Sequence, residues 1–125
     1  MATTLASPAL TLADFKGKVD PDWCPGCGDF GVLASLKSAL AGLKISPHDV
    51  ITISGIGCSS NLPGYINTYG MHTLHGRALA VATGAQLANH ELKVIATGGG
   101  GDGYGIGGHP LPHLPRRHCR LPYLG

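Results

Sequence analysis

Charged residues are scarce in this chain of 125 residues, at 13% of the total. Ordinary globular domains carry about 25% charged residues. Together with a hydrophobic fraction of 43%, this scarcity excludes disorder of the whole chain and indicates a well-buried globular protein. Nine basic and seven acidic residues leave a formal net charge of +2. We expect no binding to nucleic acid, because that charge is too small to form an extended basic surface.

Long hydrophobic runs are also absent. No stretch approaches the roughly 18 apolar residues of a membrane span, and the start of the chain has no secretory signal. We therefore expect a cytoplasmic protein with no membrane partner. Disulfides are rare in that compartment, so we interpret the cysteines as metal ligands, reactive thiols or buried small side chains. They are Cys24, Cys27, Cys58 and Cys119.

Glycine is abundant, with 20 residues of 125, and most of its clusters follow predicted strands. Two apolar runs rich in β-branched residues, 49–55 and 92–98, each end in a glycine-rich loop. These runs predict buried strands. In a parallel sheet, ligands bind at the carboxyl ends of the strands, and both glycine loops lie there.

Two helices are predicted around these strands. Helical spacing after Gly31 predicts an amphipathic helix that ends before Pro47. Its apolar face comprises Val32, Leu33, Leu36, Leu40 and Leu43. Segment 76–89 is small and apolar on nearly every side, which predicts a helix buried between layers, with Gly84 permitting close approach. The order of elements predicts an α/β fold with a parallel sheet flanked by helices, and at this length one domain or a piece of a larger one.

The two ends of the chain lack such periodicity. Residues 1–20 are predicted to form an extended N-terminal arm that lies on a neighbouring part, and residues 21–108 to form the folded domain. We interpret residues 109–125 as an aberrant or truncated tail without regular structure. Three prolines there exclude a continuous helix and a central strand, namely Pro110, Pro112 and Pro115.

The segment DWCPGCGDFG places Cys24 and Cys27 two residues apart. Such pairs occur in thiol redox sites, zinc sites and iron–sulfur loops. Cys58 follows the first predicted strand, where a third ligand from a distant loop is able to meet the pair. Three cysteines on two glycine-rich loops favour a metal or iron–sulfur site, and a redox dithiol or merely structural cysteines remain the alternatives.

The loop GGGGDG after the second strand has the composition of a phosphate cradle, with Asp102 available to a divalent cation. A tight strand-to-helix turn is the alternative interpretation. His72 and His75, next to Arg77, have the chemistry to act on a carbonyl group or to hold a phosphate. Each histidine is also typical of a core or capping position.

Taken in order, these segments resemble the β subunit of the 2-oxoacid:ferredoxin oxidoreductases, and within that family the two-subunit 2-oxoglutarate type. The resemblance runs from LADFK to GYGIGG. It rests on the order and spacing of DWCPGCGDFG, SGIGCSSNLPGYINTYGMHTLHGRALAVATG and GDGYGIGG. The chain is therefore identified as an N-terminal fragment of such a subunit, and the expected fold is a partial thiamine-diphosphate-binding domain.

The resemblance implies thiamine diphosphate, Mg²⁺ and a [4Fe–4S] cluster as cofactors. It places three of the family's four cluster ligands on Cys24, Cys27 and Cys58, and it implies a catalytic role for His75. Cofactor-binding roles are implied for Ile56, Gly57, Cys58, Ser59, His75, Gly101 and Asp102.

The implied reaction is oxidative decarboxylation of a 2-oxo acid, with 2-oxoglutarate favoured, to an acyl-CoA. Electrons pass through the cluster to ferredoxin, and an α subunit completes the thiamine and coenzyme A sites. We expect the isolated fragment to be inactive. The residues alone also leave open a small cytosolic metal-binding or iron–sulfur module and a thiol oxidoreductase that uses Cys24 and Cys27.

The sequence departs from the family at three places. The asparagine of the family's thiamine motif and its fourth cluster cysteine are expected downstream of Gly125, and Cys119 is a poor substitute for that cysteine. The family loop reads GDGDGYG and its first aspartate binds Mg²⁺, whereas Gly100 stands at that position here. Mg²⁺ binding is therefore expected to be impaired unless Asp102 replaces the missing ligand. The tail aligns with the family's helix pattern without gaps, but His109, Pro110 and His118 are mismatches that single base changes explain. We hypothesise that the tail carries sequence errors.

Overall fold

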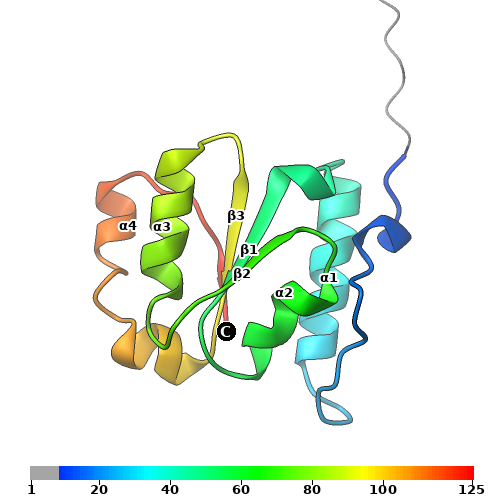
Figure 1. Ribbon diagram of the computed structural model, residues 1–125, viewed down its shortest axis with the longest axis horizontal. Coiled ribbons are helices and arrows are strands. Elements are labelled where there is room, and N and C mark those ends of the chain that lie inside the picture. The colour runs from blue at the N-terminus through cyan, green and yellow to red at the C-terminus, as the bar shows by residue number, and fades with distance from the viewer. Residues whose placement is uncertain (1–8) are drawn as a thin grey trace, which may run out of the picture.

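The computed structural model describes residues 9–125 and is organised around a parallel sheet of four strands in the order β2-β1-β3-β4. Figure 1 shows α1 and α2 on one side of this sheet and α3 and α4 on the other. The strands are β1 (Val50–Ser54), β2 (Tyr69–His72), β3 (Lys93–Thr97) and β4 (Tyr123–Leu124). The helices are α1 (Asp29–Gly42), α2 (Leu62–Tyr65), α3 (Ala78–Ala88) and α4 (His113–Arg116). Both the expected α/β class and the parallel sheet are confirmed.

The two central strands are buried because helices cover both faces of the sheet. They run side by side, with Val50 opposite Lys93 and Ser54 opposite Thr97. Successive side chains of a strand point to opposite faces, so Val50 joins the core beneath α1 whereas Ile53 joins the core beneath α3. Runs that are apolar on both faces are typical of parallel sheets, which explains why these two strands are predictable.

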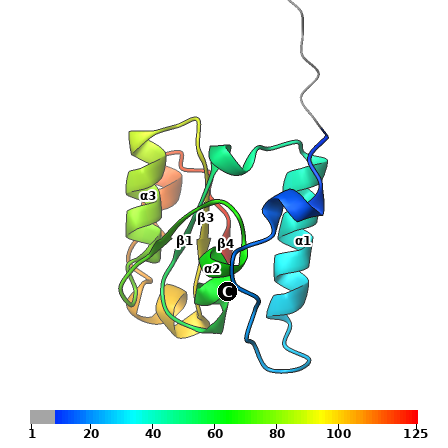
Figure 2. The same ribbon diagram turned by 45° about the vertical axis from the view of Figure 1, so that its right-hand side comes forward.

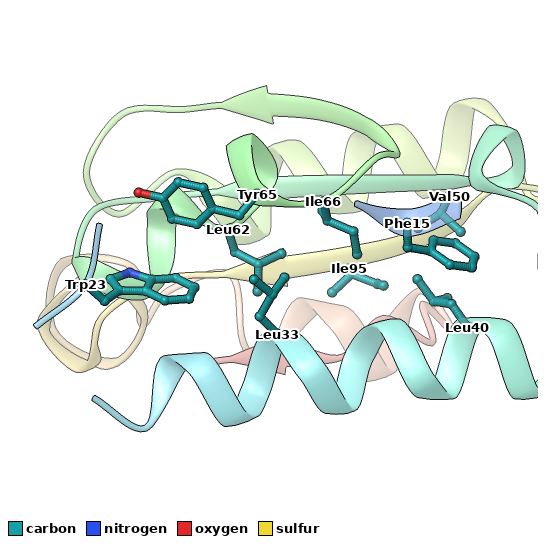
Figure 3. Packing of buried hydrophobic residues seen from close by; sticks show 9 residues of the cluster. All are labelled: Phe15, Trp23, Leu33, Leu40, Val50, Leu62, Tyr65, Ile66 and Ile95. Atoms are coloured by element: carbon teal, nitrogen blue, oxygen red, sulfur yellow. The ribbon is translucent and has the colours of Figure 1, made fainter. Parts of the chain in front are cut away.

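Helix α1 confirms the predicted amphipathic helix, with a narrower buried face than expected. Leu33 and Leu40 are buried against the sheet, while Leu43 lies beyond the last residue of the helix and is 70% exposed. Figure 3 shows these two leucines pointing into a cluster of side chains from distant segments. The cluster contains Phe15, Trp23, Leu33, Leu40, Val50, Leu62, Tyr65, Ile66 and Ile95.

The prediction that the helix of segment 76–89 is buried between layers is wrong for the described chain. Only Ala78, Leu79 and Ala82 of α3 are buried, and Leu87 is 40% exposed. A Cβ atom on Gly84 would meet no atom within 4 Å, so this glycine mediates no close approach here. The small residues of α3 cover one face of the sheet, and the opposite face of the helix borders an open hollow that residues of the 109–117 segment also line.

The N-terminal region is more structured than an extended arm. A short 3₁₀ helix, η1 (Leu12–Phe15), delivers the fully buried Phe15 to the core. Gly17 donates from its backbone N–H to the Tyr65 carbonyl at 3.2 Å, which fixes the following turn. The part of the predicted arm before residue 9 lies outside the described residues.

Strand β2 was not among the predicted elements. It pairs with β1 in parallel at the edge of the sheet, and all four of its residues are exposed. A short exposed strand contributes little apolar periodicity to the sequence, which explains why the hydrophobic pattern does not indicate it.

The expectation that residues 109–125 lack regular structure is wrong. This stretch contains α4, and its last residues form β4, which pairs in parallel with β3. Leu111, Leu114 and Tyr123 pack against the core beneath α3. Proline is tolerated next to this strand because β4 is at the edge of the sheet and the Pro122 carbonyl still accepts the N–H of Ala96 at 2.9 Å. The division of the chain at Gly108 stays a prediction.

None of the helices between residues 9 and 125 combines the length and hydrophobicity needed to cross a membrane.

Figure 2 shows the sheet edge-on between its helical layers.

Candidate functional site at the carboxyl edge of the sheet

The two glycine loops meet where β1 and β3 end. Gly55 donates its backbone N–H to the Thr97 carbonyl at 2.9 Å, and Gly99 donates to the Ile56 carbonyl at 2.9 Å. Gly57 has a φ of +133°, and a Cβ atom there would lie 2.8 Å from the Gly99 backbone nitrogen. Glycine is required at this crossing because both its conformation and the close backbone approach exclude a side chain.

The predicted cofactor-binding residues of the first loop differ in exposure. Ile56, Gly57 and Cys58 are exposed at the rim, whereas Ser59 is buried at the start of η3 (Cys58–Asn61). Nearby, the hydroxyls of Ser60 and Thr97 are buried without a hydrogen-bond partner among the described residues. These polar atoms give the edge unused hydrogen-bonding capacity.

The second loop continues into an unusual helical turn. Residues Gly101–Ile106 form a single π-helical segment, η4, with Gly100 exposed at its start. Short π-helical segments are frequent at functional sites. Gly101 is exposed, while Asp102 is turned inward and only 3% exposed. The two predicted residues of this loop, Gly101 and Asp102, therefore differ in exposure.

Asp102 is enclosed by backbone. Its Oδ1 accepts the N–H of Gly76 at 2.6 Å, and its Oδ2 is buried without a hydrogen-bond partner among residues 9–125. A Cβ atom added to Gly55 would overlap the Asp102 carboxylate, and one added to Gly98 would lie 2.5 Å from Oδ2. The carboxylate therefore fits only because glycines form the walls around it.

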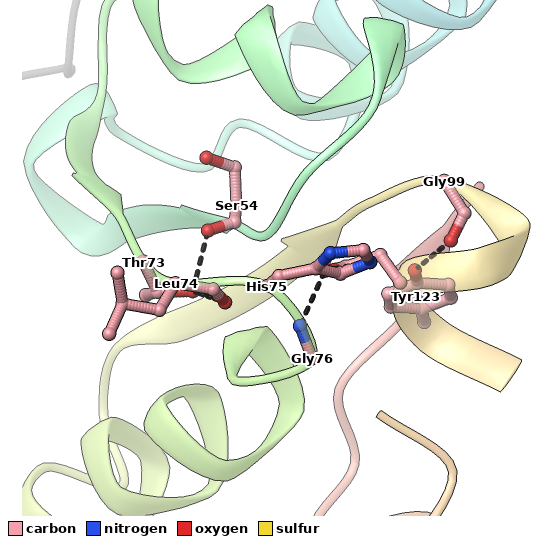
Figure 4. A network of polar contacts seen from close by, with 8 residues as sticks. Ser54, Thr73, Leu74, His75, Gly76, Gly99 and Tyr123 are labelled. Carbon is pink, nitrogen blue, oxygen red and sulfur yellow. Dashed lines mark hydrogen bonds and ion pairs between the residues drawn. The ribbon is translucent and has the colours of Figure 1, made fainter. Parts of the chain in front are cut away.

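His75 lies on the loop between β2 and α3, next to the buried Asp102. Its Nε2 is 3.9 Å from Asp102 Oδ1, and about half of its side chain is exposed. Gly76 has a φ of +74°, a left-handed conformation that suits glycine and turns the chain into α3. Figure 4 shows His75 and Gly76 on this loop, opposite the loop that carries Gly99. One ring edge of His75 is thus free for a ligand.

His72 is held separately from His75. Its Nδ1 is 2.8 Å from the buried Ser54 hydroxyl, across the β1–β2 pair. Thr73 donates its hydroxyl to the Ser54 carbonyl at 2.8 Å, so the end of β2 is fastened to the end of β1 (Figure 4). Arg77 is exposed at the start of α3. The contacts give His72 a fixed imidazole and leave no bond between His72 and His75 in the described chain.

Tyr123 is a site residue that the sequence analysis missed. Its hydroxyl donates to the Gly99 carbonyl at 3.1 Å (Figure 4), and its ring meets Tyr104 edge-on at 5.9 Å. Burial raises the pKa of the Tyr123 phenol, and the nearby carboxylate of Asp102 adds to that rise. The neighbouring prolines argue against a strand, so the sequence did not predict β4, which carries this tyrosine.

The three cysteines predicted as ligands lie on two loops that touch. Trp23 donates its indole N–H to the Cys58 carbonyl at 2.7 Å, which joins the cysteine-pair loop to the loop after β1. Cys24 and Cys58 are exposed, and Cys27 is half-buried with its thiol 3.4 Å from Asp29 Oδ2. The thiol of Cys119 lies 3.8 Å from the Arg117 carbonyl, on the tail.

Aromatic packing anchors the cysteine-pair loop. The Trp23 ring packs edge-on against Tyr65 at 4.9 Å and against Phe30 at 5.3 Å. The Tyr65 hydroxyl donates to Asp22 Oδ1. This hydrogen bond, together with burial, raises the pKa of Tyr65.

The implied metals require several ligands that converge on one point. Nowhere between residues 9 and 125 do three His, Cys, Asp or Glu side chains gather closely enough to hold a metal ion. The thiols have the donor chemistry of an iron–sulfur ligand set without converging into one. Mg²⁺ does not fit Asp102, because it needs near-octahedral oxygen ligands and retains several waters, whereas glycine backbone encloses this carboxylate.

A hollow of about 220 Å³ lies at this edge of the sheet, between the start of α1 and the ends of β3 and β4. Ser59, Thr97 and Tyr123 are among its lining residues. A larger hollow of about 420 Å³, near the start of β3, contains none of the predicted site residues. The hollow lined by Ser59, Thr97 and Tyr123 therefore belongs to the candidate site, and the one near the start of β3 does not.

The fold and its paired glycine loops define an α/β cofactor-binding domain, and comparison with known families names the class. Residues 55–122 match the family model described as "Thiamine pyrophosphate enzyme, C-terminal TPP binding domain". The chain belongs to this family.

Similar proteins narrow the class further. The chain is 51% identical over 113 residues to 2-oxoacid:ferredoxin oxidoreductase 1, subunit beta, of Aeropyrum pernix, covering 90% of this chain and 36% of that subunit. It is 44% identical over 111 residues to 2-oxoglutarate oxidoreductase subunit KorB of Mycobacterium tuberculosis, covering 89% of this chain and 30% of that subunit. The resemblance to these β subunits is confirmed, and the chain spans about a third of their length.

A solved structure has the same fold. It is a 2-oxoglutarate:ferredoxin oxidoreductase from Magnetococcus marinus with 2-oxoglutarate, coenzyme A and succinyl-CoA bound. The TM-score is 0.89 at 47% sequence identity, covering 93% of this chain and 40% of that chain.

Proposed function

We propose that the protein is part of the β subunit of a 2-oxoacid:ferredoxin oxidoreductase, which oxidatively decarboxylates a 2-oxo acid to an acyl-CoA. The substrate favoured is 2-oxoglutarate, since both a curated relative and the similar solved structure carry that name. The observation that carries the proposal is the meeting of two glycine loops beside His75 in a domain of the thiamine pyrophosphate family.

Thiamine diphosphate is the cofactor for which this domain family is named. When bound, it supplies the nucleophile for the keto carbon and the electron sink for loss of CO₂. We propose that the backbone at Gly57 and Gly101 approaches the cofactor, because both glycines are exposed at the edge and lack side chains. Ile56 would offer an apolar contact, and Cys58, Ser59 and Asp102 complete the proposed binding set.

His75 is the proposed catalytic residue. Its Nε2 lies 3.9 Å from Oδ1 of the buried Asp102 carboxylate, and about half of the side chain is exposed. An imidazole in this position is able to give or take a proton at a bound substrate or to donate a hydrogen bond to it.

We propose that Cys24, Cys27 and Cys58 bind a [4Fe–4S] cluster that passes electrons to ferredoxin. The hydrogen bond from Trp23 to the Cys58 carbonyl supports this assignment, because it keeps the two cysteine loops together before any metal binds. Thiolate ligands are the usual ligands of such clusters.

The residues present do not fit Mg²⁺, the third proposed cofactor. Gly100 provides no side-chain ligand, and glycine backbone encloses the Asp102 carboxylate. An α subunit, ferredoxin and coenzyme A are the proposed partners, and the cytoplasm is the proposed location. The similar solved structure has coenzyme A bound, which supports that part.

Iron reconstitution tests the proposal. The full chain is incubated anaerobically with iron and sulfide, and bound iron, sulfide and the charge-transfer absorbance are measured. We expect Cys58→Ser to lose most of the absorbance and Cys119→Ser, the matched control on the tail, to retain it. Thiamine diphosphate is titrated in parallel.

The outcomes separate the alternatives. Cluster formation without cofactor binding indicates a metal-binding module. A reversible Cys24–Cys27 disulfide with neither cluster nor cofactor indicates a thiol oxidoreductase. If both cofactors bind, co-expression with the α subunit should give ferredoxin reduction that depends on 2-oxoglutarate and coenzyme A.

A further inference from the structure

Asp102 contacts each loop that carries a proposed cofactor-binding residue. Its Oδ1 accepts the Gly76 N–H at 2.6 Å, on the His75 loop. Its Oδ2 faces Gly55, which opens the Ile56–Ser59 loop, and Gly98, which opens the second glycine loop. Its own carbonyl accepts the N–H of Gly107 at 2.8 Å, which closes η4. One side chain therefore connects three loops that are distant in sequence.

Keeping a carboxylate at this position is costly. The side chain of Asp102 is almost fully buried, and Oδ2 has no hydrogen-bond partner among the described residues. Removing a carboxylate from water destabilises the folded state unless hydrogen bonds compensate for the lost hydration. Because burial of the Asp102 carboxylate destabilises the folded state, we expect this side chain to have a specific role.

Metal binding is a poor explanation for that cost. The Gly98 Cβ position is 2.5 Å from both Asp102 Oδ2 and the Tyr123 hydroxyl oxygen, so Oδ2 and that hydroxyl share a small space. A hydrated Mg²⁺ ion needs room for its remaining waters, and this enclosure leaves none.

We propose that Asp102 is a positioning residue rather than a metal ligand: it fixes the His75–Gly76 turn against the two glycine loops. The hydrogen bond to the Gly76 N–H sets where the chain turns into α3, and that turn sets the position of the His75 imidazole. This inference rests on the proposed function, because the catalytic role of His75 is part of that function.

Two substitutions in the full chain separate positioning from metal binding. Asp102→Ala removes the acceptor of the Gly76 N–H, whereas Asp102→Asn retains a carbonyl oxygen that is able to accept it. Asp49→Ala, an exposed aspartate at the opposite edge of the sheet, is the matched control. The readouts are amide hydrogen exchange at Gly76 by NMR and binding of Mn²⁺ as a paramagnetic substitute for Mg²⁺.

In Asp102→Ala we expect exchange at Gly76 to accelerate about tenfold or more beyond any change at Ile53, whose amide reports global opening. Asp102→Asn should recover most of that protection, and Mn²⁺ affinity should match the original chain within about twofold in Asp102→Asn. A general loss of stability would accelerate amide exchange at Gly76 and at Ile53 equally.

Unchanged Gly76 exchange in Asp102→Ala, or a loss of Mn²⁺ binding in Asp102→Asn, would overturn the inference. If Asp102→Ala does not fold, the Mn²⁺ affinity and Gly76 amide shift of Asp102→Asn still decide between the roles. Neither readout uses thiamine diphosphate. Failure of the cofactor titration therefore counts against the proposed function and leaves this inference standing.

Discussion

The Trp23 indole N–H donates to the carbonyl oxygen of Cys58 at 2.7 Å and so joins two loops 35 residues apart in sequence. The Trp23 ring is 8% exposed and packs edge-on against Tyr65. A single tryptophan thus links the cysteine-pair loop to the first glycine loop.

Replacing Trp23 should loosen that link. Trp23→Phe keeps an aromatic ring but deletes the N–H donor and part of the buried area, so the free energy of unfolding should fall by about 1–3 kcal/mol. Urea denaturation followed by circular dichroism measures the change. Phe30→Leu, which alters only the other ring contact, should cost less. Equal stability of Trp23→Phe and the original chain would show that the hydrogen bond contributes nothing.

Gly55 should not tolerate a methyl group. A Cβ atom there overlaps the Asp102 carboxylate, which Gly98 borders and the Gly76 N–H holds by a hydrogen bond, so Gly55→Ala should destabilise the fold by about 1–3 kcal/mol. Gly100→Ala is the control, because a Cβ atom on Gly100 meets nothing within 4 Å. Thermal denaturation of the two variants makes the comparison. A smaller loss for Gly55→Ala than for Gly100→Ala would contradict the packing described here.

The Tyr65–Asp22 hydrogen bond should make stability fall at alkaline pH. It raises the pKa of the Tyr65 phenol above its ordinary value of 10.0, and burial adds to that rise. A pKa raised on folding means that the stabilisation is complete below pH 10.0 and is lost as the pH rises through the higher folded value. In Asp22→Asn, the Tyr65 pKa should move toward 10.0, and the alkaline loss of stability should be smaller.

NMR titration of the Tyr65 ring carbon measures that pKa directly. Tyr123 serves as the internal reference, since its pKa is raised mainly by burial and Asp22 is not among the causes. A Tyr65 pKa that is the same with and without the Asp22 carboxylate would refute the assigned cause.

A carboxylate at residue 100 should strengthen metal-dependent cofactor binding. Gly100 is exposed at the start of η4 with open space around it, so aspartate fits without a clash and supplies the oxygen ligand that Mg²⁺ prefers. We expect Gly100→Asp to tighten thiamine diphosphate binding in Mg²⁺ by about tenfold, or about 1.4 kcal/mol. Gly101→Asp adds the same charge one residue later and should not. Calorimetry with and without Mg²⁺ distinguishes the two variants.

The sequence predicts those parts of the fold whose signal is local. Residues 50–54 and 93–97 are rich in β-branched and small residues on both faces, so burial in a parallel sheet follows from their own composition. The meeting of the two glycine loops follows from their places after these strands. By contrast, β2 and β4 depend on pairing with a strand already in place, and their own residues give little indication of it.

The candidate site was predictable in its residue types and not in its geometry. The motifs indicate that Cys58, His75 and Asp102 carry chemistry, but burial of Asp102 depends on glycines that come from three separate loops. Tyr123 reaches the site only because β4 pairs with β3, which the prolines of the tail argue against. Long-range packing of this kind leaves no periodic signature in the sequence.

The most direct test of the central claim is an NMR titration of the full chain with thiamine diphosphate in the presence of Mg²⁺, because NMR detects even weak binding. We expect saturable shifts of the Ile56, Gly57 and Gly101 amides, with the amide of Lys93 at the opposite edge of the sheet unchanged. Absence of shifts at the glycine loops, or shifts centred on the opposite edge, would contradict it.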